Sequence, residues 1–242
     1  MMLFFLRKKD QYRAFSSFSY KDSSNKAMES LFLKQKSVLS NVSVGSTIKF
    51  GVYEQDNVTS NGKEEIEWVV LAVDDRNALI ISKYALDCQQ YNNTMNDTTW
   101  ETSSLRTWLN GAFYDAAFGA NHQQMIQSTT VTADENPPYG TSPGNNTTDK
   151  VFLLSITEAN KYFSTDEAGK CAMTYYTIVQ GAVNRGYSTE GKAVCRWWLR
   201  SPGYLSDRAA FVNSNGAVNY EGYAVNLSDV AVRPVLWINT DF

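Results

Sequence analysis

The stretch that decides the fold is CRWWLRSPGYLSDRAAFVNSNGAVNYEGYAVNLSDVAVRPVLWI, from Cys195 to Ile238. Tryptophan and aliphatic residues crowd both of its ends, whereas its middle is a run of Tyr, Asn, Ser, Asp and Gly. Dense apolar ends predict buried strands, and a polar middle with many turn residues predicts hairpins that meet solvent. The pattern therefore indicates a rigid frame that holds out a polar, aromatic surface.

From Arg208 onward, small or aliphatic residues alternate with aromatic and polar ones. Such alternation places the two sets on opposite faces of an antiparallel sheet. Asn215-Gly216 and Glu221-Gly222 are tight-turn dipeptides, so we expect a stack of short hairpins with one face on the core. The set expected on the other face begins with Phe211, Asn213, Asn219 and Asn226.

The composition of that outer face predicts binding. Tyr offers a large contact area with few rotors and a polar tip, and Asn and Ser make adaptable hydrogen bonds. The alternative is an ordinary solvated sheet face, but ordinary faces favour Lys, and no Lys occurs after Cys195. The residues that we expect to contact a ligand are Tyr204, Leu205, Ser206, Asp207, Arg208, Phe211, Asn213, Asn215, Asn219, Tyr220, Glu221, Tyr223, Asn226, Ser228 and Asp229.

The two ends of the stretch have a different expected role. WWLR and VRPVLWI contain Arg200 and Arg233 inside apolar surroundings, and Pro202 and Pro234 stiffen the chain beside them. We expect both arginines to pair with carboxylates or carbonyls beneath the hairpins and to stack on indoles. The alternative is that both contact the ligand.

Charge and cysteine content exclude several classes of protein. The chain has 242 residues and a formal net charge of −3, which argues against a nucleic-acid partner because such proteins present a basic face. Its three cysteines, Cys88, Cys171 and Cys195, have no CxxC spacing, so neither a disulfide framework nor a zinc site is expected. We expect no cofactor and no metal. We also expect no membrane insertion, because no apolar run has the length of a membrane span.

The rest of the chain predicts an α+β fold with antiparallel sheets. Alternating segments from about residue 46 to 84 predict a three-stranded meander, and KVFLLS predicts a further strand. Helices are expected over TWETSSLRTWLNGAFYDAAF, where Gly111 ends or bends the helix, and over SITEANKYF, which opens with a Ser155–Glu158 capping box. A third helical patch is expected over residues 166–180.

Residues 1–40 differ in composition and predict an N-terminal extension that serves as a docking or oligomerisation arm, or else a partly ordered tail. A helix is expected near residues 25–36. The opening MMLFFLRKKDQ lacks the form of a signal peptide, because its apolar run is short and its charges follow that run.

The chain resembles the DUF6273 family of bacterial and phage domains. The resemblance is carried by GSTIKFGVYEQDN, TWETSSLRTWLNGAF, DKVFLLSITEANKYF and WWLRSPG with AAFVNSNGAV and VRPVLWI, and it spans about residues 43–239. It implies a C-type-lectin-like domain over residues 41–242, with two main helices and a polar hairpin region closed by a Val-Arg-Pro strand.

Some proteins of that fold are variable proteins of diversity-generating retroelements, in which reverse transcription at adenines randomises Asn-type codons in a C-terminal binding region. The framing of the hairpins here is similar. Glu221 departs from the pattern if the third base of its codon is a fixed pyrimidine. The positions that an Asn codon reaches by changes at adenines alone are Tyr204, Leu205, Ser206, Asp207, Arg208, Phe211, Asn213, Tyr220, Tyr223, Asn226 and Ser228.

The sequence contains no recognisable catalytic pattern. The sole histidine, His122, stands between Asn121 and Gln123 and predicts a surface or capping role. The lectin-like fold also includes formylglycine-generating oxidases, but Cys171 and Cys195 match no motif of those enzymes, so buried structural thiols are expected.

We therefore expect a ligand-binding module and no enzyme, with a protein or a glycan as partner and residues 1–40 as a route to oligomers. Display on a bacterial or phage surface would suit this role. The alternatives are an oxidase or hydrolase that uses the same region, and a structural subunit of a phage or cell-surface assembly anchored by residues 1–40.

Overall fold

The computed structural model describes residues 42–241. The predicted N-terminal extension, its helix and its role in oligomers lie outside these residues. The described part is an α+β domain whose sheets are mostly antiparallel, as the sequence predicts. None of its helices is long and apolar enough to cross a membrane.

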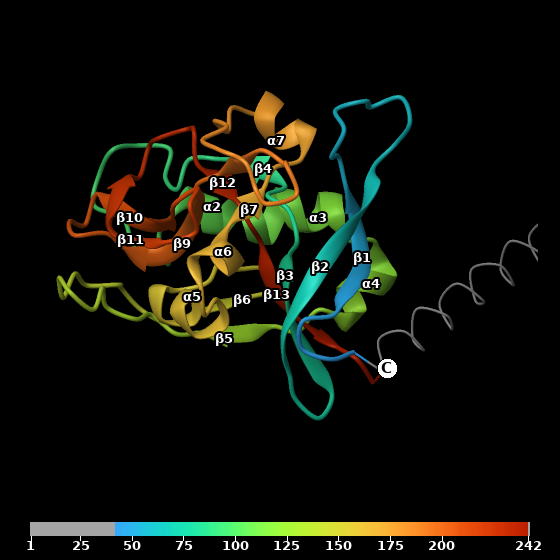
Figure 1. The fold of residues 1–242 in the computed structure, drawn as a ribbon. Coiled ribbons are helices and arrows are strands. Elements are labelled where there is room, and N and C mark those ends of the chain that lie inside the picture. Colours follow the sequence, from blue (N-terminus) through green and yellow to red (C-terminus); the bar gives the residue numbers. More distant parts are fainter. Residues whose placement is uncertain (1–41, 242) are drawn as a thin grey trace, which may run out of the picture. The chain divides into compact units, whose positions relative to one another are not determined.

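The first sheet contains the predicted meander and closes with the last strand of the chain (Figure 1). Its order is β1-β2-β3-β13, and all neighbours are antiparallel. Leu236 of β13 lies opposite Ile80 of β3, and both are fully buried. The four strands are β1 (Thr47–Tyr53), β2 (Glu64–Val73), β3 (Asn77–Ser82) and β13 (Val235–Asn239).

The second sheet contains most of the strands formed by residues 195–238. Its strand order is β11-β10-β9-β12-β4. Its neighbours are antiparallel except for β9 and β12, which run parallel. Every residue of β9 is buried, as a strand covered on both faces requires. The strands are β4 (Asp87–Cys88), β9 (Trp197–Pro202), β10 (Arg208–Val212), β11 (Val218–Ala224) and β12 (Ala231–Val232).

Two small ladders complete the strands. The segment KVFLLS was wrongly predicted as a strand, because only Phe152 bridges there, to Val235, and the strand in this region ends at Asp149. One ladder pairs β5 (Thr129–Val131) with β6 (Thr147–Asp149), and the other pairs β7 (Cys171–Ala172) with β8 (Val194–Cys195).

The first predicted helix is present but is not uniform. It runs as α2 (Ser104–Trp108), a π-helical segment (Leu109–Phe113) and α3 (Tyr114–Ala117), and Gly111 lies inside the π segment. A π segment widens the helix locally without ending it. Gly111 therefore does not end the helix.

The remaining helices are short. The helix α5 begins with the predicted capping box, in which Ser155 Oγ accepts from Glu158 N at 3.1 Å and Glu158 Oε2 accepts from Ser155 N at 2.9 Å. The third patch forms two helices separated by a strand instead of one helix. The helices of the third patch are α6 (Asp166–Gly169) and α7 (Tyr175–Val179). The other two short helices are α4 (Ala120–Met125) and α5 (Ile156–Tyr162).

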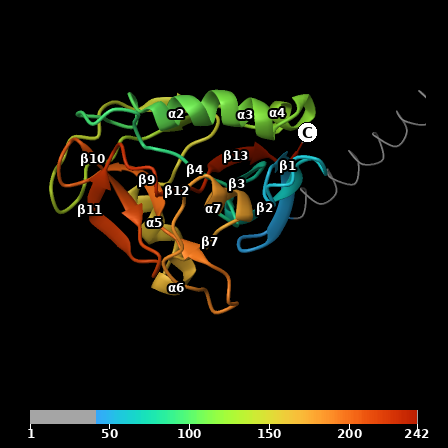
Figure 2. The same ribbon diagram turned by 90° about the horizontal axis from the view of Figure 1, so that it is seen from above.

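Both faces of the second sheet are covered. On one face, Trp197 donates from Nε1 to the Gly169 carbonyl of α6 and packs edge-on against Phe163. On the other, Trp198 donates to the Gln89 carbonyl and packs against Tyr91. Figure 2 shows α5 and α6 on the side of this sheet away from α2. The sheet is therefore a central layer of the domain.

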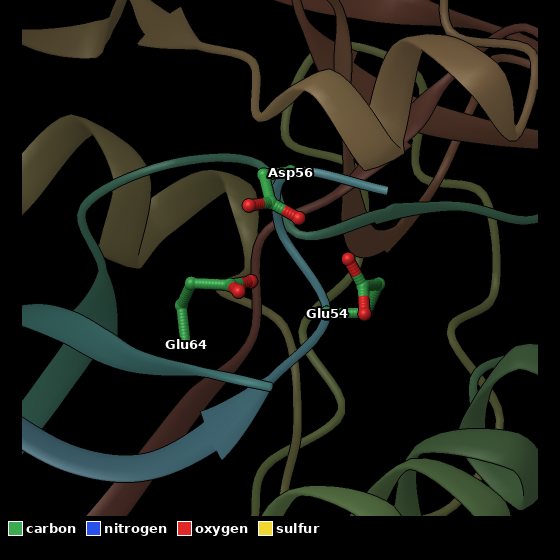
Figure 3. Close-up of side chains that lie close together, drawn as sticks. All are labelled: Glu54, Asp56 and Glu64. Atoms are coloured by element: carbon green, nitrogen blue, oxygen red, sulfur yellow. The ribbon is translucent and has the colours of Figure 1, made fainter. Parts of the chain in front are cut away.

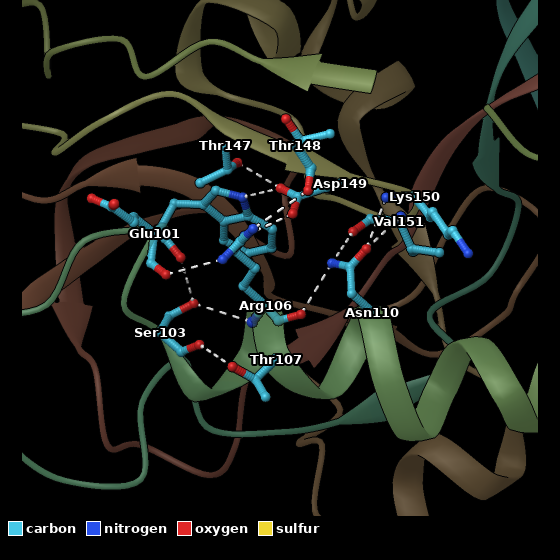
Figure 4. A network of polar contacts seen from close by, with 11 residues as sticks. Glu101, Ser103, Arg106, Thr107, Asn110, Thr147, Thr148, Asp149, Lys150 and Val151 are labelled. Atoms are coloured by element: carbon cyan, nitrogen blue, oxygen red, sulfur yellow. Dashed lines mark hydrogen bonds and ion pairs between the residues drawn. The ribbon is translucent and has the colours of Figure 1, made fainter. Parts of the chain in front are cut away.

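A buried carboxylate ties α2 to the β5–β6 ladder (Figure 4). The side chain of Asp149 accepts from Trp100 Nε1 at 2.9 Å, from Arg106 Nε at 2.7 Å and from Thr147 Oγ1 at 2.6 Å. Three donors compensate for the desolvation of a charge that would otherwise be costly to bury. This network fixes the base of the loop at residues 132–146.

Candidate functional site

The frame of the expected binding surface rests on two buried arginines. Arg200 of β9 donates to the carbonyls of Thr132 and Leu153 and pairs with Glu158. Arg233 donates from Nε to the Ser82 carbonyl at 2.9 Å, and its guanidinium lies 5.1 Å from the ring centre of Trp197. The predicted pairing is confirmed for both residues and the predicted stacking on an indole for Arg233. Both are structural, since each is about 95% buried.

The polar middle of the stretch forms one hairpin, β10–β11, and two adjoining loops. Its turn is the predicted Asn215-Gly216 dipeptide, where Gly216 has a φ of +94° and the Asn213 amide donates to the Ala217 carbonyl. The second predicted turn, at Glu221-Gly222, is wrong, because both residues lie inside β11.

Phe211 is a correction to the predicted surface. Its side chain is only 3% exposed and packs edge-on against Trp198 and Tyr223. Its β10 neighbours Ala210 and Val212 are buried too. The prediction of one core face and one solvent face fails because β10 is an inner strand covered from both sides. Phe211 is thus part of the core and not of the accessible surface.

The other expected ligand contacts all retain exposed surface. Tyr204 and Leu205 are exposed large side chains, at 41% and 45%. The half-buried members are Asp207, Arg208, Asn213, Asn219, Tyr220, Tyr223, Asn226 and Asp229, and the exposed ones are Tyr204, Leu205, Ser206, Asn215, Glu221 and Ser228.

An irregularity in β11 shapes the outer edge of the sheet. The pairing with β10 shifts between Ala209 and Phe211, so the segment around Tyr220 bulges. The Gly222 amide donates to the Asn219 side chain, and Asn136 donates from Nδ2 to the Tyr220 carbonyl at 2.7 Å. A bulged edge with occupied backbone groups is a poor template for an added strand. This edge therefore presents side chains, and few free backbone groups, to its surroundings.

Loops distant in sequence border the segment at residues 203–208. Ser206 donates from Oγ to Asp97 Oδ1 at 2.6 Å, and the ring of Tyr139 lies 6.0 Å from that of Tyr204. Arg208 places its guanidinium 5.1 Å from the Tyr204 ring centre. Sequence reasoning missed Asp97 and Tyr139, because each lies at least sixty residues away from its partner in the chain and has no motif around it.

The segment at residues 225–230 is held by other contacts. Arg185 pairs with Asp229 at 2.7 Å, and Gln90 donates from its side chain to the Asn226 carbonyl. Cys88 Sγ lies 3.2 Å from the Ser228 carbonyl. The contacts of Gln90 and Cys88 are made to backbone carbonyls, so they do not use the side chains of Asn226 and Ser228.

The three cysteines are free and buried. Cys171 and Cys195 lie opposite each other in the β7–β8 ladder. Burial raises the pKa of the Cys88 thiol to about 12 and also raises the pKa of the Cys171 and Cys195 thiols. Because the thiolate is the nucleophile, thiols that stay protonated are weak candidates for catalysis.

An acidic trio lies in the β1–β2 connection (Figure 3). Carboxylate oxygens of Glu54, Asp56 and Glu64 lie within 4.8 Å of one another. Backbone amides of the turn donate hydrogen bonds to all three carboxylates. The Val58 amide donates to both Glu54 and Asp56, and the Gln55 amide donates to Glu64. A hydrogen bond from Asn61 lowers the pKa of Asp56. The trio is accounted for as the scaffold of this turn.

A small, shallow pocket lies between the β5–β6 loop and β9. Trp100, Pro143 and Arg200 contribute to its wall. Arg200 is saturated by internal acceptors, which leaves Asp134 as the other charged residue in the wall of this pocket.

The fold and the hairpin surface define an α+β domain with two main antiparallel sheets. The family model described as "Domain of unknown function (DUF6273)" matches residues 75–240, and the chain belongs to this family. No curated protein and no solved structure matches the chain.

Proposed function

We propose that this protein is a ligand-binding module that recognises a protein or a glycan through the β10–β11 hairpin and its adjoining loops. The observation that carries the proposal is that every expected contact except Phe211 keeps exposed surface beside a strand buried along its whole length. A rigid support beneath variable polar and aromatic side chains is the arrangement that recognition surfaces use.

The proposal extends to a C-type-lectin-like fold and to a variable protein of a diversity-generating retroelement. Its support is the pairing of the hairpin with the buried strand β9, and the surface left accessible at most positions that an adenine-changed Asn codon reaches. Phe211 is the exception, because diversification there would disrupt the core.

The decisive observation for the retroelement is the neighbouring DNA. We expect a near-copy of the codons for Trp197 to Ile238 that differs only at adenines, close to a gene for a reverse transcriptase. A locus without such a copy would rule out this part of the proposal and leave ligand binding open.

Binding itself is tested with a displayed library. Randomising Tyr204, Leu205, Ser206, Glu221 and Ser228 should leave most members folded and should yield binders to a chosen protein such as lysozyme. A matched library at exposed positions of the first sheet, including Lys49 and Glu65, controls for tolerance without a recognition surface. A hairpin library that yields no more binders than the control would refute the proposal.

The enzymatic alternative finds no support in the thiols. At pH 8 we expect Ellman's reagent to react slowly with all three cysteines of the native protein and rapidly with all three in guanidinium chloride, because burial keeps the thiols protonated and covered. One rapidly reacting native thiol would revive that alternative. The anchoring role of residues 1–40 in a structural subunit concerns residues outside those described.

A further inference from the structure

A third arginine, Arg196, lies beneath the hairpin in an aromatic cup. It stands between β8 and β9, and its guanidinium lies 5.3 Å from the ring centre of Phe211 and 5.1 Å from that of Tyr223. The two rings pack against each other at 5.7 Å. Arg196 and Tyr223 are half-buried, so the cup reaches the surface of the hairpin.

The guanidinium of Arg196 lacks an acceptor within residues 42–241. Its Nη1 is buried without a hydrogen-bond partner, and no carboxylate of these residues lies within ion-pair distance. Two arginines near the hairpin have a close carboxylate: Arg200 pairs with Glu158, and Arg185 pairs with Asp229 at 2.7 Å. Within the described part of the chain, Arg208 has only Asp207 at 4.0 Å, and its Nε forms no hydrogen bond. A buried donor without an acceptor is costly and calls for an explanation. Arg233 Nη1 is also unpaired among the described residues but belongs to a buried residue, whereas the half-buried Arg196 can be reached by a ligand.

The chemistry of the cup favours a carboxylate. A guanidinium held against rings presents its donors in its own plane, and a planar carboxylate fits that fork with two parallel hydrogen bonds. A single cation in a chain of net charge −3 suits a monoanion better than a dianionic phosphate. The combination of arginine with aromatic rings favours a protein as the source of the carboxylate, because both residue types are enriched in protein interfaces.

We infer that Arg196 binds an acidic side chain of a protein partner, with Tyr223 as the accessible wall of the site and the buried Phe211 ring as its support. The inference rests on the proposed binding function and names the chemistry of its partner. Arg196 then sets a preference for acidic epitopes, while the residues around it adapt to the rest of the partner.

The test is an NMR titration of the ¹⁵N-labelled full chain, following the Nε–H resonance of Arg196. That resonance is assigned by its loss in Arg196→Gln. The probe is the N-acetyl methylamide of glutamate, and the matched probe is the same derivative of glutamine. We expect a saturable shift with the glutamate probe alone, and Arg196→Lys should weaken binding by roughly tenfold, because an ammonium lacks the planar fork.

Arg185 is the control residue, because its guanidinium is already paired with Asp229 at 2.7 Å. An unmoved Arg196 resonance, an equal response to glutamine, or an equal shift of the Arg185 resonance would overturn the inference. A tighter response to glucuronate than to the glutamate probe would overturn the assignment to a protein. The inference and the proposed function fail separately, since the glutamate shift does not depend on binders from the library.

Discussion

Single residues of the hairpin have opposite roles that their chemical type does not reveal. Phe211 and Tyr204 are both aromatic and lie within a few positions of each other, yet one is 3% exposed and the other 41%. Phe211 packs between Trp198, Tyr223 and Arg196, whereas Tyr204 meets Tyr139 and Arg208 at the surface. Phe211 therefore contributes to the stability of the core, whereas Tyr204 belongs to the surface that we propose for binding.

Replacing Phe211 with alanine should lower the free energy of unfolding by about 3–5 kcal/mol, because it leaves a cavity in a packed core. Denaturant unfolding measures this effect. The matched variant Tyr204→Ala should change stability by less than about 1 kcal/mol. Equal stabilities of the two variants would contradict the division of roles.

His122 links stability to pH. Its ring packs edge-on against Phe50 at 4.8 Å, and burial lowers its pKa below the usual value near 6.5. The unfolded chain therefore binds the proton more tightly than the folded protein, so stability is lost as the pH falls below about 6.5. Urea unfolding at pH 7.5 and pH 5.0 should show a smaller loss for His122→Gln than for the wild type, and an equal loss would contradict this account.

At the scale of elements, a glycine contact fixes the hairpin against α6. A Cβ added at Gly216 would lie 1.6 Å from the Asp166 carbonyl oxygen, and one added at Gly169 would lie 2.3 Å from the Gly216 carbonyl oxygen. The Asn215-Gly216 dipeptide therefore needs glycine for its turn and also for this close approach. The turn is buried at Gly216 while Asn215 remains exposed beside it.

Gly216→Ala should destabilise the protein by more than about 3 kcal/mol, because the clash with α6 adds to the strain of a positive φ. Gly62→Ala is the matched control, since Gly62 has a φ of +92° and open space around its Cα. The control should lose only about 1–2 kcal/mol. Thermal unfolding of both variants measures the difference, and a similar loss would mean that α6 does not constrain the turn.

At the scale of the whole molecule, Arg200 joins segments that are far apart in the chain. It bonds the Thr132 carbonyl after β5, the Leu153 carbonyl before α5, and Glu158 within α5. A buried charge with three acceptors links the central strand to a loop and a helix, so a change at this point affects the whole domain.

Glu158→Gln should lower the free energy of unfolding by about 3 kcal/mol, because it leaves the charge of Arg200 buried without its counter-ion. Glu167→Gln is the control, since its pair with Lys170 at 2.6 Å is largely exposed on the Glu167 side. That loss should stay within about 1 kcal/mol. Chemical denaturation decides the matter, and a near-neutral Glu158→Gln would contradict the role of Arg200 as a link.

Local chemistry in the sequence was enough to predict the meander at residues 46–84, the Ser155–Glu158 capping box, the Asn215-Gly216 turn and the α+β class. Each depends on periodicity or on neighbours a few residues apart. Only the tertiary structure decided that Phe211 is core, that Gly111 lies in a π segment, and that Arg196 is cupped by Phe211 and Tyr223. The physical reason is that alternation along a strand shows which side chains share a face of the sheet. It does not show which segments pack on that face, because those segments are distant in the chain.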